Sequence, residues 1–180
     1  MGMDITNYVE LRDRKTGEWK IAPVKVEMVH YEAEYMDKPC CLTKVVYEYD
    51  YAQPWYGRNS ELFSILDGEH SNSIIYGTRG LPVDISAEVY DKHEEFKREN
   101  GDDYWCFGET WYTLAELEAA ASNKKKYPKW EKWRDESGRK YKEAGVGQYL
   151  RDYVGAIQNF VNLCGYYDSA DVRIIMWWDC

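Results

Sequence analysis

The sequence predicts an α+β protein that folds as a single domain over residues 1–180. Three observations predict this class. Apolar residues alternate as in strands through most of the first fifty positions, helical spacing dominates the middle, and a nearly continuous apolar strand closes the chain. We therefore expect a mixed or mainly antiparallel sheet that includes both terminal strands. A chain of 180 residues can bury about 70% of its unfolded surface in one core.

The strands are predicted in three places. Residues 5–11 alternate, and a turn at residues 15–18 returns the chain through residues 19–21 as a hairpin. A second pair of β-rich runs covers residues 24–35 and 45–51. Residues 172–178, VRIIMWW, are apolar almost throughout, which is typical of a strand in the centre of a sheet.

Two short helices are predicted before the middle of the chain. Asn59 or Ser60 can cap the first, whose apolar residues lie between positions 62 and 66. Ser86 can cap the second, on which Val89, His93 and Phe96 share one face. His93 is therefore interpreted as a packed core residue rather than as a catalytic one.

Two further helices follow. Thr113 and Glu116 form the sequence pattern of a capping box, so a helix is expected to run to about Ala121. The longest helix signal is amphipathic and covers about residues 146–164, with Gly165 as its stop.

Charge is distributed unevenly. The net charge is −9, but nine Lys and Arg against three acidic residues give residues 124–142 a net charge of about +6. The acidic remainder argues against general binding to nucleic acid. The basic stretch is interpreted as a solvated connection between elements. The alternative is that it binds a small polyanion.

Composition bears on location and partners. Tyr (17) and Trp (8) greatly outnumber Phe (4), and such side chains suit interfaces and stacking sites. No apolar run is long enough to span a membrane, and the first residues lack the pattern of a signal peptide. Five cysteines without a CxxC spacing predict reduced thiols, and hence a cytoplasmic protein.

Five short patches resemble a family of small uncharacterised phage and prophage proteins. They read MGMDIT at 1–6, RNSELFSIL at 58–66, RGLPVDIS at 79–86, GETWYTLAEL at 108–117 and VRIIMWWD at 172–179. Their order is that of the family, and together they span nearly the whole chain. The resemblance implies a viral protein acting in the cytoplasm of an infected bacterial host.

This sequence departs from the family pattern at its histidines. Met3 and Thr6 stand where the family has Cys and His, and residues such as Gly108 and Glu109 replace the histidines that precede the family's Ser-Trp pair. These changes remove imidazoles that could ligate a metal or act as general bases. We therefore expect no metal site, no cofactor and no catalytic residue.

The candidate site combines groups that suit a nucleotide. Arginine binds phosphate through paired hydrogen bonds, aspartate accepts from ribose or base amino groups, and tryptophan stacks on a base. Connecting segments, where sites usually lie, are expected to supply Arg58, Asn59, Arg79, Asp84 and Trp111. The candidate ligand-binding residues are Asp4, Arg58, Asn59, Arg79, Asp84, Glu109, Trp111 and Asp179.

An alternative explanation needs no ligand. Arg58 with Asn59, and Arg79 with Asp84, could instead be buried ion pairs and loop braces that hold irregular segments. Asp4 and Asp179 are expected to lie together if the two terminal strands are neighbours.

The sequence thus predicts a phage counter-defence protein that binds and sequesters a nucleotide-derived immune signal. A binding role is favoured over an enzymatic one. The alternatives are an inhibitor that binds a host defence enzyme, and a hydrolase that uses paired carboxylates on a nucleotide signal. A homo-oligomer is a further expectation, because such binders often place pockets at subunit contacts.

Overall fold

The structure of the protein is a computed structural model that describes residues 4–33, 43–56, 62, 66, 79–100, 108–122, 146–165 and 167–179. The chain divides into two compact units, one made of residues 1–22 with 53–180 and the other of residues 23–52. Helices and antiparallel strands occur together, and both terminal strands belong to a sheet. The predicted α+β class is confirmed.

A four-stranded antiparallel sheet forms the centre of the larger unit, with the order β2-β1-β6-β5. β1 (Asp4–Arg12) pairs with β6 (Val172–Asp179) over eight residues. β2 (Trp19–Ile21) folds back on β1 as the predicted hairpin, and β5 (Thr110–Thr113) pairs with the other side of β6. The closing strand is therefore central, as its apolar sequence predicts.

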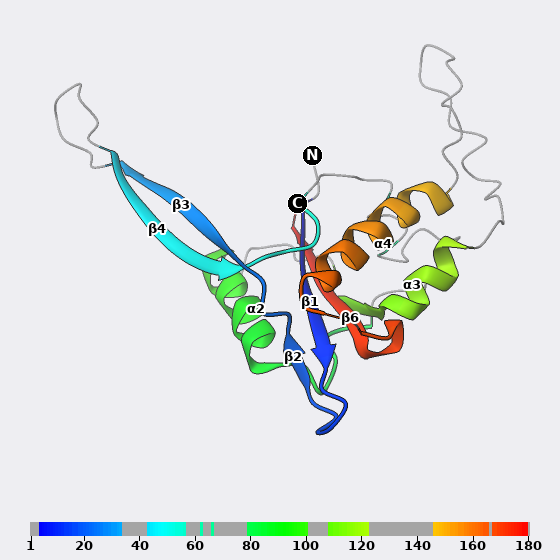
Figure 1. Ribbon diagram of the computed structural model, residues 1–180. Helices are drawn as coiled ribbons and strands as arrows, with labels where there is room; N and C mark the ends of the chain where they lie inside the picture. Colours follow the sequence, from blue (N-terminus) through cyan, green and yellow to red (C-terminus); the bar gives the residue numbers. More distant parts are fainter. Residues whose placement is uncertain are drawn as a thin grey trace, which may run out of the picture. The chain divides into compact units, whose positions relative to one another are not determined.

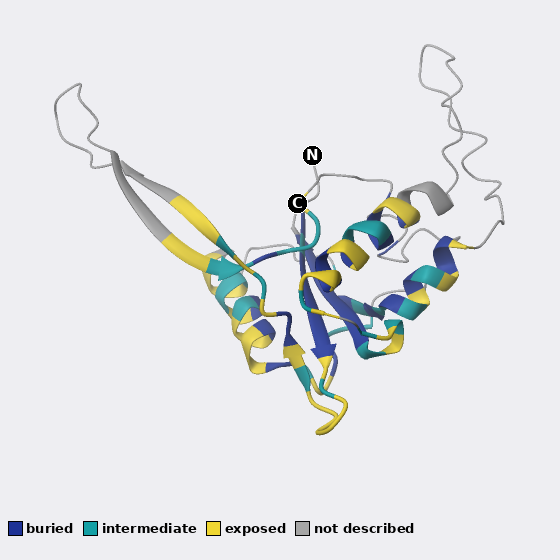
Figure 2. Ribbon diagram, viewed as in Figure 1, coloured by how far each residue is buried: buried dark blue, intermediate teal, exposed yellow. Residues whose placement is uncertain are grey.

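Both faces of β6 are buried, which explains why its sequence does not alternate (Figure 2). Ile174 and Met176 point to one face of the sheet, and Arg173 and Trp177 to the other, because side chains alternate along a strand. Arg173 is the exception in this apolar strand, since it is a charged residue that is only 2% exposed. A charge buried this deeply needs partners.

Helices cover the two faces of this sheet (Figure 1). α2 (Ala87–Asn100) covers the face of Trp177, whose ring lies 5.0 Å from the His93 ring and 6.0 Å from the Phe96 ring. α3 (Leu114–Ala121) and α4 (Val146–Asn162) pack against each other on the other side. His93 is fully buried, in agreement with its interpretation as a core residue.

α4 presents one apolar stripe to the core. Leu150, Tyr153, Ile157 and Val161 recur at the predicted spacing and are buried. The helix ends at Asn162 rather than near residue 164, because its last turn tightens: the Cys164 N–H donates to the Val161 carbonyl at 2.8 Å.

The chain returns from α4 to β6 through a short 3-10 helix, η2 (Ser169–Asp171). Arg14, in the β1–β2 turn, pairs with Asp168 and with Asp171 at this point. Both contacts are largely exposed, so we expect each to add little to stability.

The smaller unit is a two-stranded antiparallel ribbon. β3 (Lys25–Ala33) and β4 (Thr43–Tyr51) correspond to the two predicted β-rich runs, and they pair with each other over nine residues. At one end, the Lys25 ammonium lies 4.8 Å from the centre of the Tyr51 ring. At the same end, the Ala52 N–H donates to the Val24 carbonyl at 2.9 Å.

The predicted basic stretch at 124–142 falls outside the described residues. Of the predicted helix near residues 60–66, Leu62 and Leu66 are described, and both are helical and fully buried. Within the described part of the chain, no helix is both long and apolar enough to cross a membrane.

Candidate functional site

The RGLPVDIS segment joins the sheet at its β5 edge. The Arg79 N–H donates to the Thr110 hydroxyl at 3.3 Å, and the Gly80 N–H donates to the Glu109 carbonyl at 2.9 Å. Gly80 has a φ of +71°, a conformation that residues with a Cβ rarely adopt. The glycine thus lets the chain turn directly after Arg79 while its backbone stays bonded to the strand.

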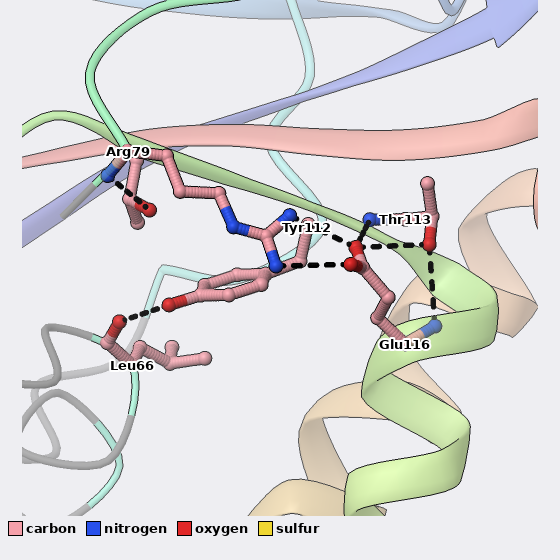
Figure 3. Close-up of polar contacts among 6 residues, drawn as sticks. Leu66, Arg79, Tyr112, Thr113 and Glu116 are labelled. Atoms are coloured by element: carbon pink, nitrogen blue, oxygen red, sulfur yellow. Dashed lines mark hydrogen bonds and ion pairs between the residues drawn. The ribbon is translucent and has the colours of Figure 1, made fainter. Parts of the chain in front are cut away.

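The Arg79 side chain lies beside the Tyr112 ring of β5 (Figure 3), and its guanidinium also approaches the Trp111 ring. Its guanidinium carbon is 5.0 Å from the centre of the Trp111 ring and 4.8 Å from that of Tyr112. Its two terminal nitrogens donate to the Glu116 carboxylate at 3.1 and 2.9 Å. We call Arg79, Trp111, Tyr112 and Glu116 the Arg79 platform.

Glu116 belongs at the same time to the N-terminus of α3. Its carboxylate accepts from the Thr113 N–H at 2.8 Å, and the Thr113 hydroxyl accepts from the Glu116 N–H at 3.2 Å. This is the capping box that the sequence predicts. Partial burial tends to raise the pKa of Glu116, but the hydrogen bonds from Arg79 and Thr113 outweigh it and lower the pKa.

A second arginine, Arg173, binds two carboxylates on the α2 side of the sheet. Its Nε donates to Glu10 at 2.5 Å, and its Nη1 donates to Asp84 at 2.6 Å. Its Nη2 also donates to the Asp84 carbonyl at 2.8 Å. Glu10 is fully buried and lies opposite Arg173 in the β1–β6 register, so this ion pair is built into the sheet.

The same network fixes the start of α2. The second oxygen of Glu10 accepts the Ser86 N–H at 2.7 Å, and the Ser86 hydroxyl accepts the Val89 N–H at 3.4 Å. Ser86 therefore caps α2 as predicted, and a buried carboxylate also lies at the helix N-terminus, where negative charge is favourable. The Arg173 guanidinium stacks on the Trp19 ring at 4.2 Å.

Asp84 is the exposed member of the Arg173 network, with 59% of its side chain accessible. Desolvation tends to raise its pKa, but the hydrogen bond and the charge of Arg173 outweigh this effect and lower the pKa. Asp84 is therefore an anion at neutral pH that can accept hydrogen bonds.

Glu109 faces α2 rather than the Arg79 platform. Its carboxylate lies 2.7 Å from Nε2 of His93 and 3.2 Å from the Lys97 ammonium. The approach to His93 is not aligned as a hydrogen bond, and neither ring nitrogen of His93 has a hydrogen-bond partner among the described residues. Glu109 thus directly precedes β5 in the chain, but its carboxylate lies next to His93 and Lys97 of α2.

The structure corrects two predictions about these residues. Arg79 and Asp84 do not pair with each other, because Glu116 binds Arg79 and Arg173 binds Asp84. Trp111 does not belong to a connecting segment: it lies within β5, opposite Ile175. Arg79 and Trp111 are nevertheless brought together, and the Arg173 guanidinium lies 5.9 Å from the centre of the Trp111 ring.

Asp4 and Asp179 are direct partners in the β1–β6 register, as expected for neighbouring terminal strands. They lie at the far end of β6 from Arg173, however. Positions 173 and 179 are six residue steps apart along the strand, which corresponds to about 20 Å. The predicted single cluster is therefore wrong in this respect. Arg58 and Asn59 lie outside the described residues.

Five residues of the Arg79 platform and the Arg173 network are absent from the predicted site, namely Glu10, Trp19, Tyr112, Glu116 and Arg173. A signal for two of them exists in the sequence. Arg173 interrupts the apolar run of β6, and Glu10 lies between the apolar residues Val9 and Leu11 of β1; a buried charge in a strand requires an opposite charge nearby. Trp19 and Glu116 offer no such signal, since their contacts depend on the register of β2 and on the course of the chain at residue 79.

Comparison with known proteins assigns no family. No family model, no curated protein and no solved structure matches the chain. Among the described residues, no group of three or more His, Cys, Asp or Glu side chains is arranged to hold a metal ion.

Proposed function

We propose that this chain is a phage counter-defence protein that binds and sequesters a nucleotide-derived immune signalling molecule without turning it over. The phage assignment rests on the resemblance of the five sequence patches. The ligand class rests on the Arg79 platform, in which a guanidinium and two aromatic rings lie together at the edge of the sheet. This juxtaposition is the observation that carries the proposal.

The platform provides the two kinds of contact that a nucleotide needs. Trp111 is partly exposed and can stack on a base, a contact worth roughly 1–3 kcal/mol, whereas Tyr112 is fully buried. A guanidinium binds phosphate through two parallel hydrogen bonds. The Arg79 side chain is 18% exposed and Glu116 is 42% exposed, so solvent reaches the pair. In this proposal a phosphate of the ligand takes the place of the Glu116 carboxylate on Arg79.

The acidic residues favour binding over acid–base catalysis. The arginines lower the pKa values of Asp84 and Glu116, and a carboxylate with a lowered pKa is a weak proton donor and a weak base near neutral pH. Such groups accept hydrogen bonds from ribose hydroxyl or base amino groups. This chemistry supports a protein that holds its ligand intact.

A thermal-shift screen tests the proposal. Cyclic dinucleotides, cyclic trinucleotides and cyclic isomers of ADP-ribose are the compounds to screen. A ligand present at a hundred times its Kd stabilises the folded state by about 2.7 kcal/mol. For a chain of this size, one compound should therefore raise Tm by roughly 5–10 °C. A screen in which no compound shifts Tm contradicts sequestration, and loss of the compound from solution supports the hydrolase.

Matched variants separate ligand binding from simple bracing. Arg79→Ala should abolish the shift, whereas Arg98→Ala, which removes an exposed arginine of α2, should leave it unchanged. Glu116→Gln should keep or enlarge the shift, because it removes the internal competitor for Arg79. If the Arg79 platform is only a brace, Arg79→Ala lowers the Tm of the free protein and leaves the ligand-induced shift intact.

The alternative is an inhibitor that binds a host defence enzyme. The observation that favours it is the exposure of large tyrosines in the larger unit: Tyr56 is 65% exposed and Tyr90 is 46% exposed. Aromatic side chains often dominate the affinity of protein interfaces. Capture of one host protein in the absence of nucleotide, lost on mutation of both tyrosines to serine, would favour this alternative.

A further inference from the structure

The β3–β4 ribbon has two properties that favour packing against, or pairing with, a further β-element. It is a separate compact unit of two strands, and an isolated two-stranded ribbon is at best marginally stable in water. It also exposes large apolar side chains, with Tyr49 at 69%, Val29 at 43% and Met28 at 39%. Both strands are edge strands of this sheet among the described residues.

We propose that the ribbon is a dimerisation element, and that its occupant is the ribbon of a second copy of this chain. In this dimer, β4 pairs antiparallel with β4 of the partner around a two-fold axis perpendicular to the sheet. The two ribbons then form one four-stranded sheet. Such an interface is isologous, so the same strand supplies both halves.

The symmetry restricts the register. A two-fold axis perpendicular to the sheet keeps each side chain on its own face, and side chains alternate along a strand. An even-numbered residue must therefore lie opposite an even-numbered residue of the partner, and an odd-numbered residue opposite an odd-numbered one. At the centre, one residue of β4 lies opposite the same residue of the partner. A centre at Tyr47 pairs all nine residues, 43–51, with none left over.

Charge favours this register. With Tyr47 at the centre, the Lys44 position of each copy falls opposite Asp50 of the other, so two opposite-charge pairs form on the same face of the sheet. A centre one residue later places Glu48 opposite itself. The corresponding pairing of two β3 strands around Val29 sets Val26 opposite Glu32 and forms no charge pair.

The β3 strands also explain why assembly should stop at two copies. After β4 pairs with its counterpart, the remaining edges of the four-stranded sheet are the two β3 strands. These carry Lys25, Glu27 and Glu32, and charges on an edge strand oppose further strand addition. The charge pattern thus favours a closed dimer over an open-ended stack.

Charge reversal with mixing tests the proposal on the full-length chain. Wild type should be a dimer by sedimentation equilibrium. Lys44→Asp and Asp50→Lys should each weaken it roughly tenfold, because each creates two like-charge pairs. An equimolar mixture of the two variants should recover the wild-type affinity, since both charge pairs re-form in the heterodimer.

The mixing experiment also controls for damage within one chain. Lys44 lies opposite Glu32 of its own ribbon, so Lys44→Asp can weaken the ribbon itself, but mixing cannot repair an intrachain defect. Glu48→Lys is the matched control on the same face of β4. When it is mixed with Lys44→Asp, the affinity should recover only in part, because one of the two charge pairs re-forms in the heterodimer and the other stays a pair of like charges. A monomeric wild type, or full recovery with Glu48→Lys in place of Asp50→Lys, would overturn the proposed pairing.

Discussion

The buried Arg173 network makes the largest quantitative prediction. Arg173→Leu removes the only positive charge that the structure places on Glu10 among the described residues, and Glu10 is fully buried. Removing one partner of a buried ion pair typically costs 3–5 kcal/mol, because the remaining charge stays uncompensated. At about 2–4 °C per kcal/mol for a chain of this size, Tm should fall by roughly 6–20 °C.

A double variant tests the cause of that loss. In Glu10→Leu with Arg173→Leu no buried charge is left, and the exposed Asp84 can be solvated. The Ser86 N–H still loses its acceptor, which costs about 1–3 kcal/mol. The double variant should therefore lose less stability than Arg173→Leu alone.

Urea unfolding followed by circular dichroism measures both effects. Arg98→Leu, a change of the same chemistry at an exposed position of α2, should alter stability by at most about 0.5 kcal/mol. The reasoning is refuted if Arg173→Leu costs no more than this control. It is refuted as well if the cost of the double variant equals the sum of the two single variants.

Three further predictions concern local features of the larger unit. Thr113→Ala should cost about 1 kcal/mol in urea unfolding because α3 loses its capping box, and Thr113→Ser should retain most of that stability. Tyr153→Phe should be neutral or slightly stabilising, because the buried Tyr153 hydroxyl has no hydrogen-bond partner in the described part of the chain. Tyr112→Phe should instead destabilise the protein, because it loses the hydrogen bond to the Leu66 carbonyl at 2.7 Å. The pKa values of Asp84 and Glu116 in the folded state are lower than their ordinary values of 3.8 and 4.5. The stability that these carboxylates contribute is therefore complete above their ordinary pKa values, and it is lost as the pH falls through their lowered pKa values. Tm should thus drop below about pH 4, and the drop should be shallower in Asp84→Asn with Glu116→Gln; an equally steep drop in that variant would contradict the assignment.

Elements whose signal is local could be predicted from the sequence. The capping box at Thr113, the serine cap at Ser86 and the apolar stripe of α4 each depend on residues within one or two turns of each other. The central place of β6 could also be predicted, because a strand that is apolar on both faces has to be covered on both.

The partners of the candidate site could not be predicted in the same way. Arg79 pairs with Glu116, 37 residues away, and Arg173 pairs with Asp84, 89 residues away. Such choices depend on strand order and register, which local sequence does not encode. Arg79 and Asp84 are close in sequence and opposite in charge, which favours the wrong pairing when the topology is unknown.

Recovery of the ligand tests the central claim most directly. The protein is incubated with the cyclic nucleotide identified by the thermal-shift screen, separated from free compound and heated to unfold it. The released compound is then quantified by chromatography. Sequestration predicts that the compound returns intact and in stoichiometric amount. Recovery of a cleaved product, or of no compound at all, would contradict it.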